Sequence, residues 1–267
     1  MTTAARKGEG DPILPAALED GVLRLTLNRP AARNALSEEL MAALAGALDR
    51  AGQDRACRIV VIAAAGPAFC AGHDLREMRS DTRRQTYERL FAQCSELMLK
   101  IVRLPKPVIA EVQGVATAAG CQLVATCDLA VAGEAARFAV PGINIGLFCS
   151  TPMVALSRAV GRKPAMEMLL TGELIDARAA RALGLVNRVV AQSELRGAVD
   201  ALARQIAAKS SFTVAIGKEA FYRQAELDLA SAYAYAAEIM TRNMMARDAA
   251  EGIDAFLGKR PPVWQDS

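Results

Sequence analysis

The sequence predicts an α/β fold, and three features of its pattern support this prediction. The segments 58–64 and 107–112 are short and almost wholly apolar, as expected of strands that are covered by helices on both faces. Both segments run into turns rich in Gly and Ala, and helical segments follow. After about Ser150 helical patterns dominate, so we expect an α/β core with a helical region packed on it or on a neighbouring subunit.

The first 150 residues supply the elements of this core in order. Residues 21–28 alternate apolar and polar side chains, which is typical of a strand with one buried face. Ser37 offers an N-cap, and two glutamates follow it in the first turn of a helix that runs to about Arg50. Later patterns predict a helix at 82–103, a turn at 114–120, a helix at 121–126, a strand at 128–132 and a strand within 185–190.

Composition excludes several classes of protein. The 267 residues are 52% hydrophobic and carry a net charge of only +3, which argues against a nucleic-acid partner. No apolar run reaches the ~18 to 20 residues that a membrane span requires, so we expect no membrane partner. Residues 1–20 are expected to be a disordered tail without a secretory signal. None of the 6 cysteines forms a Cys-x-x-Cys pair, which indicates buried thiols and a cytoplasmic location.

Two turns that follow the apolar strands are candidate ligand sites. The first is Gly66–Leu75 and the second is Gln113–Gln122. Both contain Gly and Ala where a backbone can approach a ligand closely. The second opens a helix, whose free N–H groups and dipole favour an anion. Small-residue turns are also common in α/β proteins, so neither turn alone identifies a ligand.

Together these turns resemble the two active-site loops of the enoyl-CoA hydratase/isomerase (crotonase) family. The matching segments are AFCAGHDLREM at 68–78 and VQGVATAAGCQLVATCDLAVA at 112–132. Further matches occur in the same order, at LTLNRPAARNAL (25–36), LPKPVIA (104–110), ARFAVPGINIG (136–146), the run 171–180, GLVNRVV (184–190) and EGIDAFLGKRPPVW (251–264). The resemblance therefore covers the chain from about Gly21 onward.

The resemblance implies a crotonase (ClpP-like) superhelix of ββα units over residues 21–200. Residues 201–267 would form a C-terminal helical trimerisation region, so we expect a homotrimer or a hexamer. The implied ligand is an acyl-CoA thioester. Coenzyme A is then part of the substrate, and no separate cofactor is expected.

The resemblance also implies roles for individual residues. The backbone N–H groups of His73 and Ala119 would bind the thioester oxygen and stabilise an enolate-like oxyanion. The adenine end of coenzyme A would lie against the backbone near Ala71, within the same loop as Asp74 and Leu75. Two arginines that follow the first strand, Arg29 and Arg33, are candidates for the phosphates, or else they are solvated loop arginines.

His73 is the only histidine of the chain, which excludes a metal site or a catalytic triad that needs further histidines. No metal is expected. Its imidazole either lines the acyl pocket as an acid or base, or packs on the loop or faces solvent.

The family pattern breaks at the two glutamates that hold a water molecule in its hydratases. These positions are Gln122 and Gly142 here. One acid–base group contributes roughly 10²- to 10⁴-fold to a rate, so ordinary hydration is doubtful. Other residues could substitute for the carboxylates of these glutamates. The resemblance places Asp74 in the coenzyme-binding loop, and Asp128 stands at a strand start, where we interpret it as structural. Cys149 and Ser150 could face the acyl pocket, but a cysteine nucleophile needs a base or a positive neighbour, and the sequence shows none.

Two further motifs, PGINIGLFCSTP at 141–152 and KRPPVW at 259–264, resemble one subgroup, the third type of enoyl-CoA hydratase domain-containing protein. Its members also lack the glutamates. Two functions stay open: an enzyme of acyl-CoA metabolism, nominally a hydratase or isomerase, or a non-catalytic acyl-CoA-binding or regulatory protein. The retained oxyanion loops favour the first, and the absent glutamates favour the second.

Overall fold

Two β-sheets form the centre of the protein in the computed structural model, which describes residues 12–267. The large sheet has the strand order β1-β2-β3-β5-β7-β10, and the small sheet has the order β4-β6-β8-β9. The strands are β1 (Ala16–Glu19), β2 (Val22–Leu27), β3 (Ile59–Ala64), β4 (Ala68–Cys70), β5 (Val108–Val112), β6 (Val115–Thr117), β7 (Leu129–Gly133), β8 (Arg137–Ala139), β9 (Ile175–Asp176) and β10 (Arg188–Val190).

A repeated unit of two strands and a helix generates both sheets. Strands β3, β5 and β7 are parallel neighbours in the large sheet. Each is followed by a short strand of the small sheet, in which β4, β6 and β8 are also parallel neighbours. Helices follow each strand pair. This is the ββα repeat that the family resemblance implies, and it places the ends of β4 and β6 side by side.

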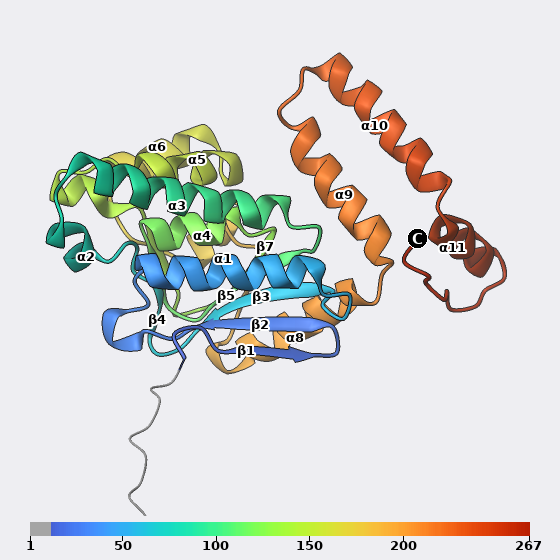
Figure 1. Cartoon of the computed structure of the whole chain (residues 1–267), viewed down its shortest axis with the longest axis horizontal. Coiled ribbons are helices and arrows are strands. Elements are labelled where there is room, and N and C mark those ends of the chain that lie inside the picture. The colour runs from blue at the N-terminus through green and yellow to red at the C-terminus, as the bar shows by residue number, and fades with distance from the viewer. Residues whose placement is uncertain (1–11) are drawn as a thin grey trace, which may run out of the picture.

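Helices cover both faces of the large sheet (Figure 1). In β3, Val60 and Ile62 pack into the main core with α1, α3 and α4. The alternate residues Ile59 and Val61 pack on the opposite face, against α8. All four side chains are fully buried. The all-apolar strand is therefore buried on both faces, as its sequence predicts.

Helix boundaries agree closely with the predicted ones in the first half of the chain. The Ser37 hydroxyl accepts a hydrogen bond from the Leu40 N–H at 3.1 Å, which confirms the expected N-cap. The helices are α1 (Glu38–Gln53), α2 (Leu75–Ser80), α3 (Arg84–Arg103), α4 (Ala119–Thr126), α5 (Ser150–Ala159), α6 (Arg162–Thr171), α7 (Ala177–Ala182), α8 (Leu195–Ala207), α9 (Ser211–Gln224), α10 (Leu229–Met244) and α11 (Arg247–Leu257), with short 3-10 turns at Pro30–Ala32, Pro141–Ile145 and Gln192–Glu194.

The last three helices, α9, α10 and α11, extend to one side of the α/β core (Figure 1). A buried ion pair anchors α9, in which Lys218 Nζ lies 2.6 Å from Asp128 Oδ2. The same carboxylate accepts a hydrogen bond from the Tyr222 hydroxyl at 2.9 Å. Asp128 therefore joins the core to the helical region, which agrees with its interpretation as a structural residue.

Two predicted boundaries are wrong. The expected disordered tail over 1–20 includes Ala16–Glu19, which form β1 and pair antiparallel with β2, while residues 1–11 lie outside the described part of the chain. The expected division at residues 200 and 201 falls inside α8, whose Leu202 and Ala203 are buried against the large sheet. The helical region therefore begins after α8. None of the helices within residues 12–267 combines the length and apolarity that crossing a membrane requires.

Candidate active site

The two predicted loops lie side by side because the strands that precede them pair. Cys70 of β4 is opposite Ala116 of β6, so both chains turn at the same edge of the small sheet. Gly72 has a φ of +100°, and a Cβ atom there would lie 2.9 Å from the Ala118 Cβ and 3.5 Å from the Ala119 nitrogen. Only glycine fits this contact. The first loop therefore passes directly beside the amide of Ala119.

The backbone N–H of His73 has no acceptor because the residues on either side of it, Gly72 and Asp74, take both backbone hydrogen bonds to Leu36. The Leu36 N–H donates to the Gly72 carbonyl at 2.8 Å, and the Asp74 N–H donates to the Leu36 carbonyl at 3.2 Å. Because successive groups of an extended chain point to opposite sides, the His73 N–H points away from Leu36. It has no acceptor within residues 12–267.

The Ala119 N–H has no acceptor among the described residues, because it stands at the first position of α4. The first helical bond runs from the Gln122 N–H to the Ala118 carbonyl at 3.0 Å, so the preceding amides have no helical acceptor. Ala118 itself has φ 51° and ψ −120°, an unusual conformation for a residue with a Cβ atom, of the kind that clusters at functional sites. The helix dipole also favours negative charge at this end.

The imidazole of His73 packs against α3 rather than facing solvent. Its ring meets the Phe91 ring edge to face, with 5.9 Å between the centroids. Both ring nitrogens are buried, and neither makes a hydrogen bond of normal geometry within the described residues, although the nearby Leu36 carbonyl partly opposes the effect of burial on the pKa of the ring. Burial lowers the pKa of His73 below 6.5, so the ring is neutral at neutral pH.

Gln122 and Gly142, the two positions that the resemblance equates with the hydratase glutamates, have different surroundings. The Gln122 side chain is buried, and its carboxamide oxygen lies 3.9 Å from the Cys94 sulfur as a weak acceptor. The Gly142 N–H donates to the Cys149 sulfur at 3.3 Å. A Cβ atom at Gly142 would lie only 2.6 Å from the Leu147 carbonyl oxygen and 2.8 Å from the Cys149 sulfur. The structure therefore has room for a polar side chain at 122 and for none at 142.

A groove of about 670 Å³ gathers most of the residues predicted to bind coenzyme A. The Arg33 side chain is exposed there and has no ion-pair partner within the described residues, and Leu75 is 52% exposed. The Ala71 N–H donates to the Arg33 carbonyl at 3.1 Å, which ties the loop to this rim. The lining residues are Arg29, Ala31, Ala32, Arg33, Ala35, Asp74, Leu75, Arg76 and Glu77.

Arg29 and Asp74 bind each other in this groove. The Arg29 guanidinium lies 3.0 Å from Asp74 Oδ2 and donates to the Ala35 carbonyl at 2.7 Å. Asp74 also caps α2, because its other carboxylate oxygen accepts the N–H groups of Arg76 and Glu77. Both side chains therefore have structural partners, and Arg33 is the better candidate for a phosphate contact.

Sequence reasoning missed Asn34, which is fully buried with a φ of 54°. Its amide nitrogen donates to the carbonyls of Ala65 and Ala68, each at 2.8 Å. Its amide oxygen accepts the Arg29 N–H, also at 2.8 Å. Asn34 thus fastens the turn that carries both arginines to the loop that leads to His73. The only signal in the sequence is that Asn tolerates a positive φ better than most residues.

The other candidates for acid–base or nucleophilic chemistry lack activating partners. All six cysteines are free and buried. Burial raises the pKa of Cys149, which disfavours the thiolate that a nucleophile needs. The Ser150 hydroxyl donates to the Phe148 carbonyl at 3.3 Å. Neither residue therefore has the geometry of an activated nucleophile.

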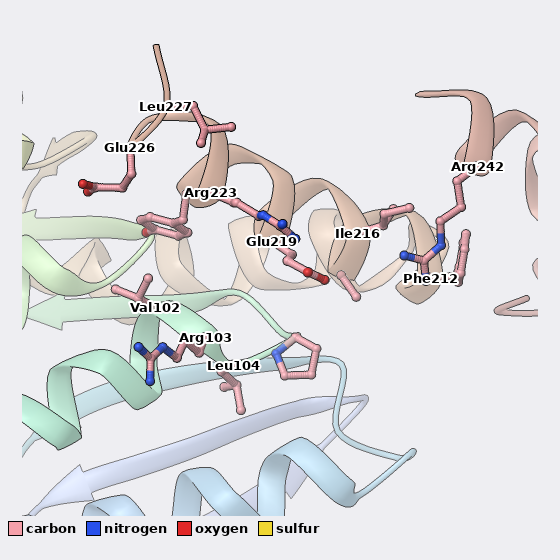
Figure 2. Close-up of a pocket in the computed structure, with 13 residues that line it drawn as sticks. Val102, Arg103, Leu104, Phe212, Ile216, Glu219, Arg223, Glu226, Leu227 and Arg242 are labelled. Carbon is pink, nitrogen blue, oxygen red and sulfur yellow. The ribbon is translucent and has the colours of Figure 1, made fainter. Parts of the chain in front are cut away.

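A second cavity, of about 710 Å³, lies between the end of α3 and the helices α9 and α10 (Figure 2). Val102, Arg103 and Leu104 line one side, and residues of α9 such as Ile216 and Glu219 face them. Val102 is 11 residues along α3 from the helix position that contacts His73, roughly 16 Å at 1.5 Å per residue. This cavity is therefore separate from the two loops.

Comparison with known proteins finds relatives that are similar in sequence and in fold. The sequence profile described as enoyl-CoA hydratase/isomerase matches residues 17–267. The chain is 45% identical to the human enoyl-CoA hydratase domain-containing protein 3, mitochondrial, over 97% of this chain and 86% of that protein. A crystal structure of that human protein superposes with a TM-score of 0.92, covering 95% of this chain and 100% of the other.

A crystal structure of enoyl-CoA hydratase from Mycobacterium smegmatis is also similar, with 58% identity and a TM-score of 0.93, covering 95% of this chain and 99% of the other. These similarities confirm the expected crotonase fold and the expected subgroup. They correct the expected cytoplasmic location, because similar proteins from human, rat and Xenopus laevis are mitochondrial proteins by name.

Proposed function

The chain belongs to the enoyl-CoA hydratase/isomerase (crotonase) family, and on this premise we propose that it binds an acyl thioester of coenzyme A. The thioester oxygen is held between the backbone N–H groups of His73 and Ala119. One observation carries this proposal. The N–H groups of His73 and Ala119 have no acceptor among the described residues, and they lie on adjacent turns, because Gly72 contacts Ala118 and Ala119. A free N–H at a helix start attracts an anion without further help.

The chemistry that this arrangement supports is stabilisation of negative charge on the thioester oxygen. Fixed donors stabilise an enolate-like transition state at little reorganisation cost, and one such donor is worth about 3 to 4 kcal/mol in comparable sites. The enzyme hypothesis therefore rests on the donors alone. Ordinary hydration of an enoyl-CoA is expected to be very slow, because Gln122 cannot accept a proton and Gly142 has no side chain.

A specific observation favours the second candidate, a non-catalytic acyl-CoA-binding protein. Gly142 is enclosed by Leu147 and Cys149, so the position that would supply the second carboxylate is closed as well as empty. A panel of acyl-CoAs with mass detection of products separates the two candidates, since an enzyme converts at least one thioester and a binding protein converts none.

Binding itself is tested by calorimetry with acyl-CoA and free coenzyme A. We expect a dissociation constant in the micromolar range, equivalent to ~8 kcal/mol.

Arg33→Glu should weaken acyl-CoA binding more than tenfold and leave binding of the matching acyl-pantetheine, which lacks the adenine nucleotide, unchanged. Arg188→Glu makes the same charge change at an exposed residue of β10 and serves as the control. If no thioester binds, the proposed function is wrong.

We also propose that the helical region forms the contacts of a trimer or hexamer. Helices α10 and α11 expose many large apolar side chains, more than an isolated surface usually carries. The exposed set includes Leu229, Tyr233, Met240, Met244, Met245, Phe256 and Leu257. Light scattering should give the mass of a trimer or hexamer at micromolar concentration, and a monomer would contradict this assignment.

A further inference from the structure

The pairing of β4 with β6 sets how the His73 and Ala119 N–H groups lie relative to each other. His73 follows the last residue of β4 by three positions, and Ala119 follows the last residue of β6 by two. A slip of one residue between these strands would move one donor past the other by about 3.3 Å. Donors to an oxyanion act from roughly 2.7 to 3.1 Å, so the proposed site depends on this register.

The two strands are too short to hold the register by their own pairing. Each has three residues. Ala68 lies opposite Val115 and Cys70 lies opposite Ala116, so β4 advances by two residues where β6 advances by one. A bulge of this kind disrupts the ladder locally and leaves one residue unpaired. We therefore expect side-chain contacts to fix what the backbone pairing leaves loose.

The side chain of Gln113, just before β6, makes such contacts. Its amide nitrogen donates to three carbonyls of the chain that leads into β4, those of Ala64, Gly66 and Ala68, each at 3.0 Å. The amide has two hydrogens, so at least one is shared. The amide oxygen is buried without a partner within residues 12–267. Half a turn of the amide would bring this oxygen against the carbonyl oxygens, so one orientation is strongly preferred.

Two glycines show how closely the two loops approach on either side of β6. A Cβ atom at Gly114 would lie 1.9 Å from the Pro67 carbonyl oxygen, and one at Gly120 would lie 2.1 Å from the Cys70 carbonyl oxygen. These van der Waals contacts limit how near the two chains come. Hydrogen bonds are directional, so the Gln113 amide also fixes the position of one chain along the other.

We propose that Gln113 is a positioning residue, whose amide sets the register of the two loops and thereby the spacing of the two N–H donors. The inference rests on the proposed function, because the spacing matters only if a thioester oxygen is held between the donors. Asn34 bonds to two carbonyls of the same stretch, but it belongs to neither loop. It fastens the first loop to the arginine turn, whereas Gln113 joins the first loop to the second.

Two matched ligands separate positioning from folding. Butyryl-CoA has the thioester oxygen, and the thioether S-butyl-CoA lacks it. We expect the wild type to bind the thioester roughly tenfold more tightly, from two hydrogen bonds of ordinary net strength. Gln113→Met keeps the length of the side chain but removes the amide. It should lower this affinity ratio by about threefold or more and leave the affinity for S-butyl-CoA unchanged.

Gln93→Met is the control. It makes the same change at a glutamine of α3, whose amide donates to the Glu38 carbonyl at 2.8 Å, and it should leave the affinity ratio unchanged. Infrared difference spectra give a second readout that a loss of stability alone does not move. With ¹³C at the thioester carbonyl, the C=O stretch should move to lower frequency in the wild type and in the control, because both donors polarise the bond. It should move less in Gln113→Met.

An unchanged affinity ratio or an unchanged C=O shift in Gln113→Met would each overturn the inference while leaving acyl-CoA binding intact. Equal affinities of the wild type for the two ligands, or no binding of either, would overturn the proposed function as well. If Gln113→Met does not fold, Gln113→Asn decides, because its amide is one carbon too short to reach all three carbonyls. Its affinity ratio should lie below that of the wild type, and an equal ratio would overturn the inference.

Discussion

Asn34→Ala should strongly destabilise the fold, because Asn34 joins the turn before α1 to the loop that leads to His73. The substitution removes three hydrogen bonds and takes this partner from the Ala65 carbonyl and the Arg29 N–H, whereas the Ala68 carbonyl keeps a hydrogen bond from the Gln113 amide at 3.0 Å. A net loss of about 1 kcal/mol per bond gives about 3 kcal/mol. The φ of 54° adds about 1 to 2 kcal/mol, because Ala has a Cβ atom and no side-chain polar group to stabilise this conformation.

The expected sum of about 4 to 5 kcal/mol is a large part of the 5 to 15 kcal/mol that typically holds a domain together. Asn34→Gly separates its two components, because Gly accepts the positive φ but makes no side-chain bonds. It should be more stable than Asn34→Ala by about 1 kcal/mol. Urea unfolding at one fixed protein concentration measures both variants. A loss below about 1 kcal/mol in Asn34→Ala would refute the role of Asn34, and equal losses in both variants would refute the backbone contribution.

Three further predictions follow from the pKa of His73, the anchor of α9 and the missing glutamates. Burial lowers the pKa of His73 in the folded state below 6.5, so the unfolded chain takes up the proton at a higher pH than the folded protein does. The free energy of unfolding should therefore fall as the pH drops from about 6.5 toward the folded pKa. This part of the decline should be absent in His73→Phe. Lys218→Met leaves the Asp128 carboxylate without its cation in a site where the two side chains are 7% and 14% exposed. Urea unfolding should show a decrease of roughly 3 to 5 kcal/mol in the free energy of unfolding. The control Lys163→Met, at an exposed position of α6, should change this free energy little. The wild type should hydrate crotonyl-CoA very slowly in an absorbance assay, and robust hydration would show that another residue supplies the proton transfer.

The large sheet, except for β1, could be predicted from the sequence, whereas the small sheet could not. Strand β3 is an apolar run of six residues, and four of the five residues of β5 are apolar, so their pattern alone indicates burial. By contrast, β4, β6 and β8 have three residues each, too few for a period to be recognised. They are strands because they pair with one another across long separations, and β6 accordingly lies inside the segment predicted to be a turn.

The candidate site shows the same division between features that neighbouring residues determine and contacts between residues far apart in the sequence. The two loops could be recognised because their Gly and Ala residues are contiguous in the sequence. The capping role of Asp74 was also within reach, since Asp followed three residues later by Glu77 is a helix-start signal. The ion pair between Arg29 and Asp74 joins residues 45 positions apart. Its partners depend on the folded arrangement, and the sequence alone left Arg29 as a phosphate ligand or a solvated side chain.

Gly142 shows most clearly why a departure from the expected family pattern cannot be interpreted from sequence alone. The pattern suggests an empty position that a glutamate could refill together with one at Gln122. In the structure, the Leu147 N–H bonds to the Gly142 carbonyl at 2.9 Å, and the Leu147 oxygen and the Cys149 sulfur occupy the space of a side chain. The segment from Gly142 to Cys149 can adopt this conformation only because residue 142 has no Cβ atom. A glutamate at this position therefore requires a different course of this segment.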